Sequence, residues 1–187
     1  MAYQLIRNQH RPPQSGAVLL CDTSTSMCSI DTPGGVKRRI DHLAEVLAGV
    51  LSKVRVAHLL TFDTYVRELP LGTQIQIEPP SGSTALHLAL EFVSELPGEI
   101  SQLILLTDGS PDNDVLALAA MQRLQHARPM LVRAYYVGAE GDRVAMAFLQ
   151  RLIALAAPGS TVGRFNLSEP LKVTGELVLR LTHQPDR

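Results

Sequence analysis

The stretch that decides the fold of this chain is residues 17–26, AVLLCDTSTS. Its first half is a short, uninterrupted apolar run, which is typical of a strand that is buried on both faces. Its second half changes abruptly to one carboxylate and several hydroxyls. Open α/β sheets bind their ligands beyond the carboxyl ends of the strands, where the order of the strands reverses. We therefore predict an α/β domain with a polar site directly after this strand.

The alternation of apolar runs and helical stripes continues along the rest of the chain. Further strands are predicted from mostly apolar runs at 56–62, 103–106 and 131–137, together with a short edge strand at 66–69 after a tight turn and a last, weak strand near 163–165. Helices are predicted where apolar residues recur every three or four positions, at 43–51, 86–93, 117–124, 144–155 and 169–181. This order predicts a Rossmann-like, doubly wound, mostly parallel sheet of about six strands, with one short antiparallel edge strand and helices on both faces.

Length and composition limit the class of protein. A chain of 187 residues is the size of one domain. We expect an N-terminal arm at 1–15, the domain at 16–183 and a short tail at 184–187. The net charge of −1 gives no electrostatic footprint for a nucleic acid. The first residues lack the apolar core of a secretory leader, and no apolar run is long enough to cross a bilayer. We therefore expect a cytoplasmic protein that binds neither nucleic acid nor membrane.

Two local features have plain structural interpretations. The short basic cluster Lys37–Arg38–Arg39 is expected to be a solvated helix start. Cys21 is expected to be a small buried hydrophobic residue. A disulfide between Cys21 and Cys28 is possible but disfavoured, because the context is typical of a cytosolic protein.

Three polar segments follow strands or precede helices, and they are the candidate site. The first is Asp22-Thr23-Ser24-Thr25-Ser26, the second is Gly82-Ser83-Thr84, and the third is Thr107-Asp108-Gly109. Together they supply two carboxylates and three hydroxyls, without His or Cys. Such hard oxygen donors suit Mg²⁺, Mn²⁺ or Ca²⁺ rather than Zn²⁺ or Cu²⁺.

In this order, the three segments resemble the metal-ion-dependent adhesion site of von Willebrand factor A (vWA) domains, and the resemblance covers roughly residues 16–181. It implies that Ser24, Ser26 and Thr84 bind a Mg²⁺ ion directly, with Mn²⁺ or Ca²⁺ as substitutes. Asp22 and Asp108 would hold the ion directly or through water. The implied function is a non-enzymatic, metal-dependent protein–protein interaction module, whose partner supplies an Asp or Glu carboxylate. In its size, this chain resembles the stand-alone vWA proteins of bacteria, which are intracellular.

One residue departs from the family pattern. Many members have Gly between the two serines, whereas this chain has Thr25. A β-branched residue restricts the backbone more than Gly does, so Thr25 is expected to tighten or reshape the loop without removing a ligand.

Each segment also has a plainer explanation. Asp and Ser often cap helices, and Thr-Asp-Gly is an ordinary strand-to-turn sequence. Asp63 is interpreted as a turn residue, and Asn113 or Asp114 is expected to cap the helix that follows. Asp112 and Asp114 could add negative charge near the ion, but turn and N-cap roles are the simpler interpretation. His87 lies one turn after Thr84, but a surface position is the simpler interpretation.

Two enzyme classes are the alternatives. A phosphohydrolase of the haloacid-dehalogenase type also places Asp after a first strand and binds Mg²⁺. It needs a second carboxylate two residues later, where this chain has Ser24, and a Lys before its last motif, whereas no Lys lies between Lys53 and Asp108. A serine hydrolase would need a nucleophile elbow that is missing from this sequence.

Overall fold

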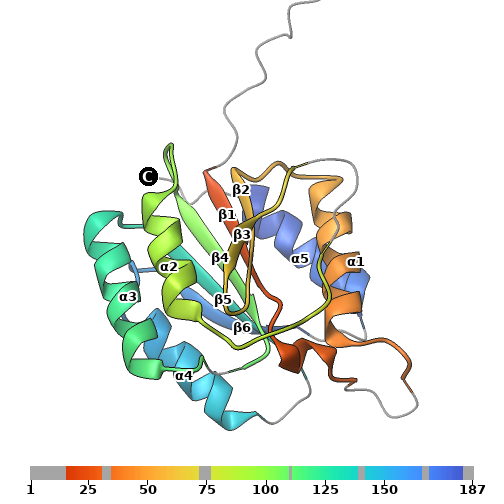
Figure 1. Ribbon diagram of the computed structural model, residues 1–187. Helices are drawn as coiled ribbons and strands as arrows, with labels where there is room; N and C mark the ends of the chain where they lie inside the picture. Colours follow the sequence, from red (N-terminus) through yellow and green to blue (C-terminus); the bar gives the residue numbers. More distant parts are fainter. Residues whose placement is uncertain are drawn as a thin grey trace, which may run out of the picture.

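The structure is a computed structural model that describes residues 16–30, 35–71, 77–109, 111–138, 142–165 and 169–182 (Figure 1). The predicted arm at 1–15 and the tail at 184–187 lie outside the described residues. The elements are, in chain order, β1 (Ala17–Asp22), the 3-10 turn η1 (Thr25–Cys28), α1 (Arg39–Leu51), β2 (His58–Phe62), β3 (Val66–Glu68), α2 (Leu86–Glu95), β4 (Gln102–Thr107), α3 (Asp114–Ala127), β5 (Leu131–Val137), α4 (Arg143–Ile153), β6 (Thr161–Phe165) and α5 (Pro170–Thr182).

The sheet has six strands in the order β3-β2-β1-β4-β5-β6. Only β3 runs antiparallel to its neighbour, β2, and the other four pairings are parallel. The predicted sheet, its antiparallel edge strand and its α/β class are therefore confirmed. The chain builds outward from β1 to β3 on one side and returns to place β4 on the other side of β1. The strand order thus reverses between β1 and β4, and a crevice is expected beyond their carboxyl ends.

Helices cover both faces of the sheet, as Figure 1 shows. Helices α2, α3 and α4 pack on one face, and α1 and α5 pack on the other. Strand β1 supplies both cores, because successive side chains of a strand point to opposite faces. Val18 and Leu20 belong to the first core, whereas Leu19 and Cys21 belong to the second. The apolar run at the start of β1 is continuous because both of its faces are buried.

Several smaller predictions about the fold are settled by the structure. Cys21 is buried and Cys28 is exposed, and neither forms a disulfide. The side chain of Asn113 caps α3 by accepting a hydrogen bond from the N–H of Leu116 at 3.0 Å. None of the helices among the described residues is both long and apolar enough to cross a membrane.

Candidate metal site

Asp22 ends β1 and lies at the centre of the candidate site, with a fully buried side chain. One carboxylate oxygen, Oδ1, accepts the backbone N–H of Ser24 at 2.8 Å. The other oxygen, Oδ2, accepts the hydroxyl of Thr107 at 2.6 Å. Thr107 can reach it because β1 and β4 are neighbours in the sheet, with Cys21 paired to Leu106. The strand pairing itself therefore holds Asp22 at the crevice.

Asp108 and the two serines complete a connected group of oxygens. The Ser26 hydroxyl donates to Oδ1 of Asp108 at 2.7 Å, and the Ser24 and Ser26 hydroxyls lie 3.0 Å apart. The turn η1 brings these two hydroxyls together, because it folds the chain back directly after Ser24. Asp22, Ser24, Ser26 and Asp108 therefore share one hydrogen-bonded network at the carboxyl ends of β1 and β4.

Thr84 lies on the neighbouring loop, and backbone contacts hold that loop against the site. The Thr25 hydroxyl donates to the carbonyl of Gly82 at 2.8 Å. The N–H of Thr84 donates to Oδ1 of Asp112 at 2.9 Å, and the N–H of Asp112 donates to the carbonyl of Thr84 at 3.1 Å. Among the described residues, the Thr84 hydroxyl has no hydrogen bond to the other four candidate ligands. The loop brings Thr84 to the site without joining it to the network.

Gly82 allows this loop to pass close to its neighbours. Its φ of +66° lies in the left-handed region that favours glycine. A Cβ atom at this position would lie 2.3 Å from Oγ1 of Thr64, which is far inside van der Waals contact. The approach of the Thr84 loop to the turn after β2 therefore requires glycine.

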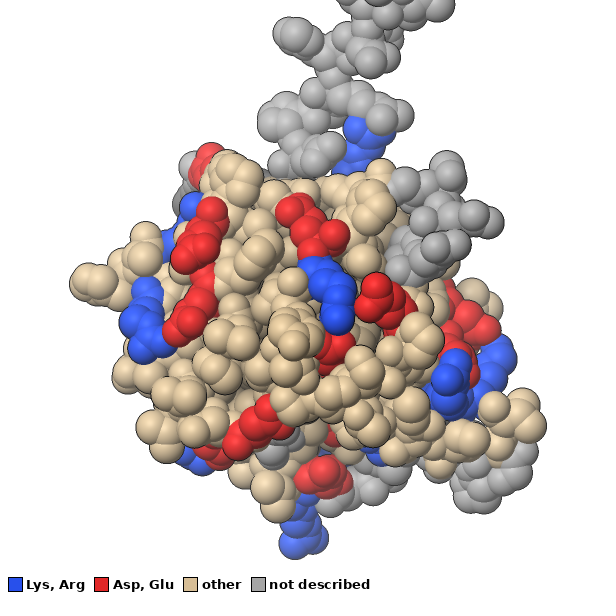
Figure 2. Space-filling view, viewed as in Figure 1, with Lys and Arg blue, Asp and Glu red and all other residues tan. Residues whose placement is uncertain are grey.

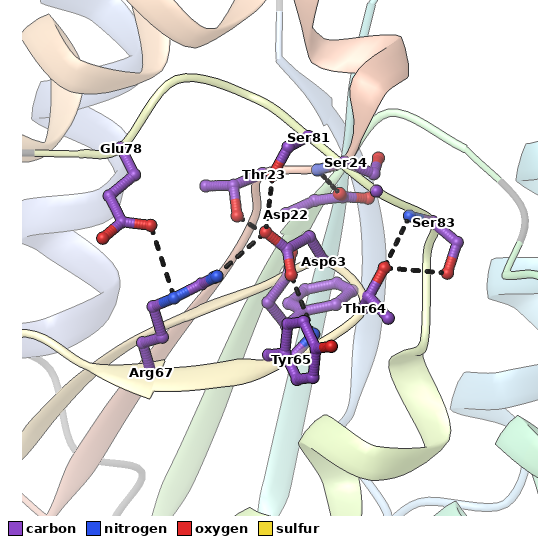
Figure 3. A network of polar contacts seen from close by, with 12 residues as sticks. Asp22, Thr23, Ser24, Asp63, Thr64, Tyr65, Arg67, Glu78, Ser81 and Ser83 are labelled. Carbon is purple, nitrogen blue, oxygen red and sulfur yellow. Dashed lines mark hydrogen bonds and ion pairs between the residues drawn. The ribbon is translucent and has the colours of Figure 1, made fainter.

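Asp63 joins the turn after β2 to the same loop (Figure 3). Its Oδ1 accepts the N–H of Tyr65 at 2.8 Å, which shapes the turn as the sequence predicts. Its Oδ2 accepts a hydrogen bond from Arg67 at 3.0 Å and another from Ser81 at 3.3 Å. Its backbone carbonyl accepts the N–H of Ala85 at 2.9 Å. Asp63 is therefore a positioning residue for the loop that carries Thr84.

The buried carboxylates of Asp22 and Asp108 repel each other. Burial, followed by the negative charge of Asp108, raises the pKa of Asp22 from 3.8 to about 6. Hydrogen bonds from Ser24 and Thr107 act in the opposite direction without cancelling this effect. A cation at the site would relieve both the burial of charge and the repulsion.

Arg39 contacts the candidate site, although the sequence interpretation placed it in solvent. Nη1 of Arg39 donates to Oδ2 of Asp108 at 2.7 Å, and the two side chains are only 14% and 0% exposed. Arg39 therefore does not extend into solvent as expected of a helix start. Its neighbour Arg38 does, since its side chain is 44% exposed and pairs with Asp41 on the same helix. The two adjacent arginines differ in position: Arg38 is the N-cap residue and pairs with Asp41 in the first turn of α1, whereas Arg39 is the first helical residue and pairs with Asp108.

The donor set fits a small, hard cation. No group of three or more His, Cys, Asp or Glu side chains that could hold a metal lies within the described parts of the chain. A site here must therefore use hydroxyl oxygens beside its two carboxylates, as the sequence predicts. Neighbouring ligands of an octahedral Mg²⁺ lie about 3.0 Å apart, since each bond is about 2.1 Å long. The Ser24–Ser26 and Ser26–Asp108 oxygen separations of 3.0 and 2.7 Å are close to that spacing.

Comparison with known proteins supports the fold. No protein-family model matches the sequence, and no curated protein matches it significantly. Solved structures do match. The manganese-loaded TRAP protein of Plasmodium vivax has a TM-score of 0.58 at 21% identity, over 88% of this chain and 73% of that one. A von Willebrand factor type A protein of Catenulispora acidiphila has a TM-score of 0.65 at 16% identity, over 90% and 42%. BatB of Bacteroides thetaiotaomicron has a TM-score of 0.57 at 14% identity, over 88% and 97%. This chain has the vWA fold.

Thr25 gives a first testable prediction. Thr25→Gly removes the hydroxyl that holds Gly82 and loosens the backbone before Ser26. One such hydrogen bond is worth about 1 kcal/mol, which is roughly a fivefold change in a dissociation constant. We expect Thr25→Gly to bind Mg²⁺ about fivefold more weakly in a calorimetric titration. Thr25→Ser keeps the hydroxyl and is the matched control. Equal affinities for Thr25→Gly and wild type would show that the link does not matter.

Proposed function

We propose that this chain is a divalent-metal-dependent protein–protein interaction module. Its cation, Mg²⁺ or Mn²⁺, would be held by Ser24, Ser26, Thr84, Asp22 and Asp108, and a partner carboxylate would be the last ligand. The observation that supports this most is the network of four of these residues at the point where the strand order reverses. The manganese-loaded TRAP structure shows that a protein of this fold can hold a divalent ion.

The residues favour a bound ion that still attracts anions. Only Asp22 and Asp108 are negatively charged among the proposed ligands, and hydroxyls neutralise little of a cation's charge. The bound cation would supply Lewis acidity toward an incoming oxygen ligand. Ser26 is exposed, so this part of the site can be reached from outside. An Asp or Glu side chain of another protein is the ligand that matches both the charge and the hardness of such an ion.

The site is proposed to bind rather than to catalyse. Both oxygens of Asp22 are already engaged by Ser24 and Thr107, and Ser24 stands where a haloacid-dehalogenase enzyme needs a second carboxylate. The serine hydroxyls contact each other and Asp108, which does not activate a nucleophile as a histidine would. We expect no turnover of a generic aryl phosphate in the presence of Mg²⁺. Turnover that disappears in Asp22→Ala would instead support the phosphohydrolase.

The partner is expected to be a protein, not a nucleic acid or a membrane. Acidic and basic side chains are interspersed on the face seen in Figure 2, which agrees with the net charge of −1. On this face, the described residues form no continuous positive patch of the kind that binds polyanions. A cytoplasmic location stays a prediction.

Affinity capture tests the proposed function. Immobilised wild-type protein in Mg²⁺ is compared with the same protein in EDTA and with Ser26→Ala in Mg²⁺. We expect a specific partner to be retained only by the wild type in Mg²⁺, and to be lost when its own contacting Asp or Glu is replaced. A set of captured proteins that neither EDTA nor Ser26→Ala changes would contradict the proposal.

A further inference from the structure

Arg39 places a positive charge against the carboxylate that the proposed metal site uses. Nη1 of Arg39 lies 2.7 Å from Oδ2 of Asp108, while the other oxygen of Asp108 is bound by Ser26. The Asp108 side chain is fully buried, and that of Arg39 is 14% exposed. A charge pair in such surroundings is weakly screened by water and salt. The N–H of Arg39 also donates to the carbonyl of Ser29 at 2.9 Å, which links the start of α1 to the residue that follows η1.

We propose that Arg39 is a tethered cation that lowers the affinity of this site for divalent ions and makes ion binding depend on an anionic ligand. The proposal rests on the proposed function, because it concerns the same site. Asp22 and Asp108 carry two negative charges, and Arg39 reduces the total to −1. A divalent ion then brings the site to +1, whereas without Arg39 the loaded site would be neutral. The positive loaded site gains from a carboxylate ligand, and that ligand in turn retains the ion.

The charge of Arg39 is tested by comparing two substitutions. Arg39→Gln removes the charge and keeps an amide N–H donor, on a side chain that is two bonds shorter. Arg39→Lys keeps the charge on a different head group. Arg38→Gln is the matched control, because it removes the same charge from the next residue, whose side chain is solvated and paired with Asp41. Each protein is titrated with Mg²⁺ alone and with Mg²⁺ in saturating acetate, by calorimetry, and its thermal stability is measured in EDTA.

We expect Arg39→Gln to bind Mg²⁺ at least about tenfold more tightly than wild type, because a unit charge so close to the site repels a divalent ion strongly. Arg39→Lys and Arg38→Gln should stay near the wild-type affinity. Acetate should tighten Mg²⁺ binding in the wild type and have less effect in Arg39→Gln. In EDTA, Arg39→Gln should unfold at a lower temperature than wild type, since two buried carboxylates then lack their counter-charge.

The outcomes separate the inference from the proposed function. Unchanged or weaker Mg²⁺ binding in Arg39→Gln, with normal binding in wild type, would overturn the role of Arg39 alone. An equal effect of acetate on wild type and Arg39→Gln would overturn the dependence on an anion. If no variant and no wild-type protein responds to Mg²⁺, the metal site itself is absent and the proposed function fails with it.

Discussion

Replacing Asp22 with Asn is expected to stabilise the metal-free protein while abolishing its response to Mg²⁺. The carbonyl of the new amide side chain can still accept the N–H of Ser24, and its NH₂ group can donate to the Thr107 hydroxyl, so the network survives. The change removes a buried charge and its repulsion with Asp108. The pKa of Asp22 is raised from 3.8 to about 6, and such a difference corresponds to about 3 kcal/mol at neutral pH.

The pH dependence of stability follows from the same shift. A folded-state pKa above the unfolded value means that the folded protein binds the proton more tightly. The stabilisation from protonated Asp22 is therefore complete below pH 3.8 and is lost as the pH rises through about 6. In EDTA, the stability gap between Asp22→Asn and wild type should be largest at pH 7 and close toward pH 4.

Urea unfolding with and without Mg²⁺ measures both effects. Saturation at a hundred times the dissociation constant adds about 2.7 kcal/mol to a protein that binds the ion only when folded. We expect this gain in wild type and none in Asp22→Asn. Asp114→Asn is the control, because its carboxylate is 38% exposed and pairs with Arg151 on the surface. An Asp22→Asn protein that is less stable than wild type in EDTA, or that Mg²⁺ still stabilises, would refute this electrostatic account.

Replacing Asp63 with Ala is expected to have the second large effect, on the loop that carries Thr84. Burial alone would raise the pKa of Asp63, but hydrogen bonds from Tyr65 and Arg67, together with the charge of Arg67, hold it below its usual value. The ionised carboxylate thus stabilises the fold at neutral pH, and this contribution is lost as the pH falls. Removing a buried carboxylate that accepts three hydrogen bonds should cost about 3 kcal/mol.

The same substitution should weaken metal binding without touching a proposed ligand. Of the two contacts between Asp63 and this loop, Asp63→Ala removes the side-chain contact with Ser81 and keeps the backbone contact with Ala85. We expect Asp63→Ala to bind Mg²⁺ about tenfold more weakly, as a loss of about 1.4 kcal/mol would produce. Glu78→Ala is the control, because it removes the other acidic partner of Arg67. The side chain of Glu78 is 67% exposed, so its loss should change the free energy of unfolding by less than about 0.5 kcal/mol. Equal metal affinities for Asp63→Ala and wild type would show that Thr84 does not depend on this anchor.

Much of the fold could be predicted because its signals are local. All residues of strand β1 before Asp22 are apolar, and the strand is buried on both faces. In α2 and α4, the buried apolar residues recur every three or four positions, as expected of helices with one buried face. The edge strand β3 is polar at two of its three positions, and it was recognisable mainly from the tight turn that follows β2. The four-residue network was predictable because Asp22 and Asp108 follow adjacent strands, and the carboxyl ends of parallel strands meet at one edge.

The contacts that cross between loops could not be predicted in the same way. Asp112 was interpreted as a turn residue, but its carboxylate binds the backbone of Thr84, 28 positions earlier. Arg39 lies 69 positions from Asp108 and looks in the sequence like any basic helix start. These contacts form only because α1 and the loops pack against the sheet in a particular way. The periodicity of apolar residues in the sequence does not predict that packing.

The most direct test of the central claim is a calorimetric titration of Mg²⁺ and Mn²⁺ against wild type and Asp22→Ala. We expect one ion bound per wild-type chain and none in Asp22→Ala, with circular dichroism showing that the variant is folded. If the two proteins bind the ions equally, or if neither binds them, the polar network at the ends of β1 and β4 is not a metal site.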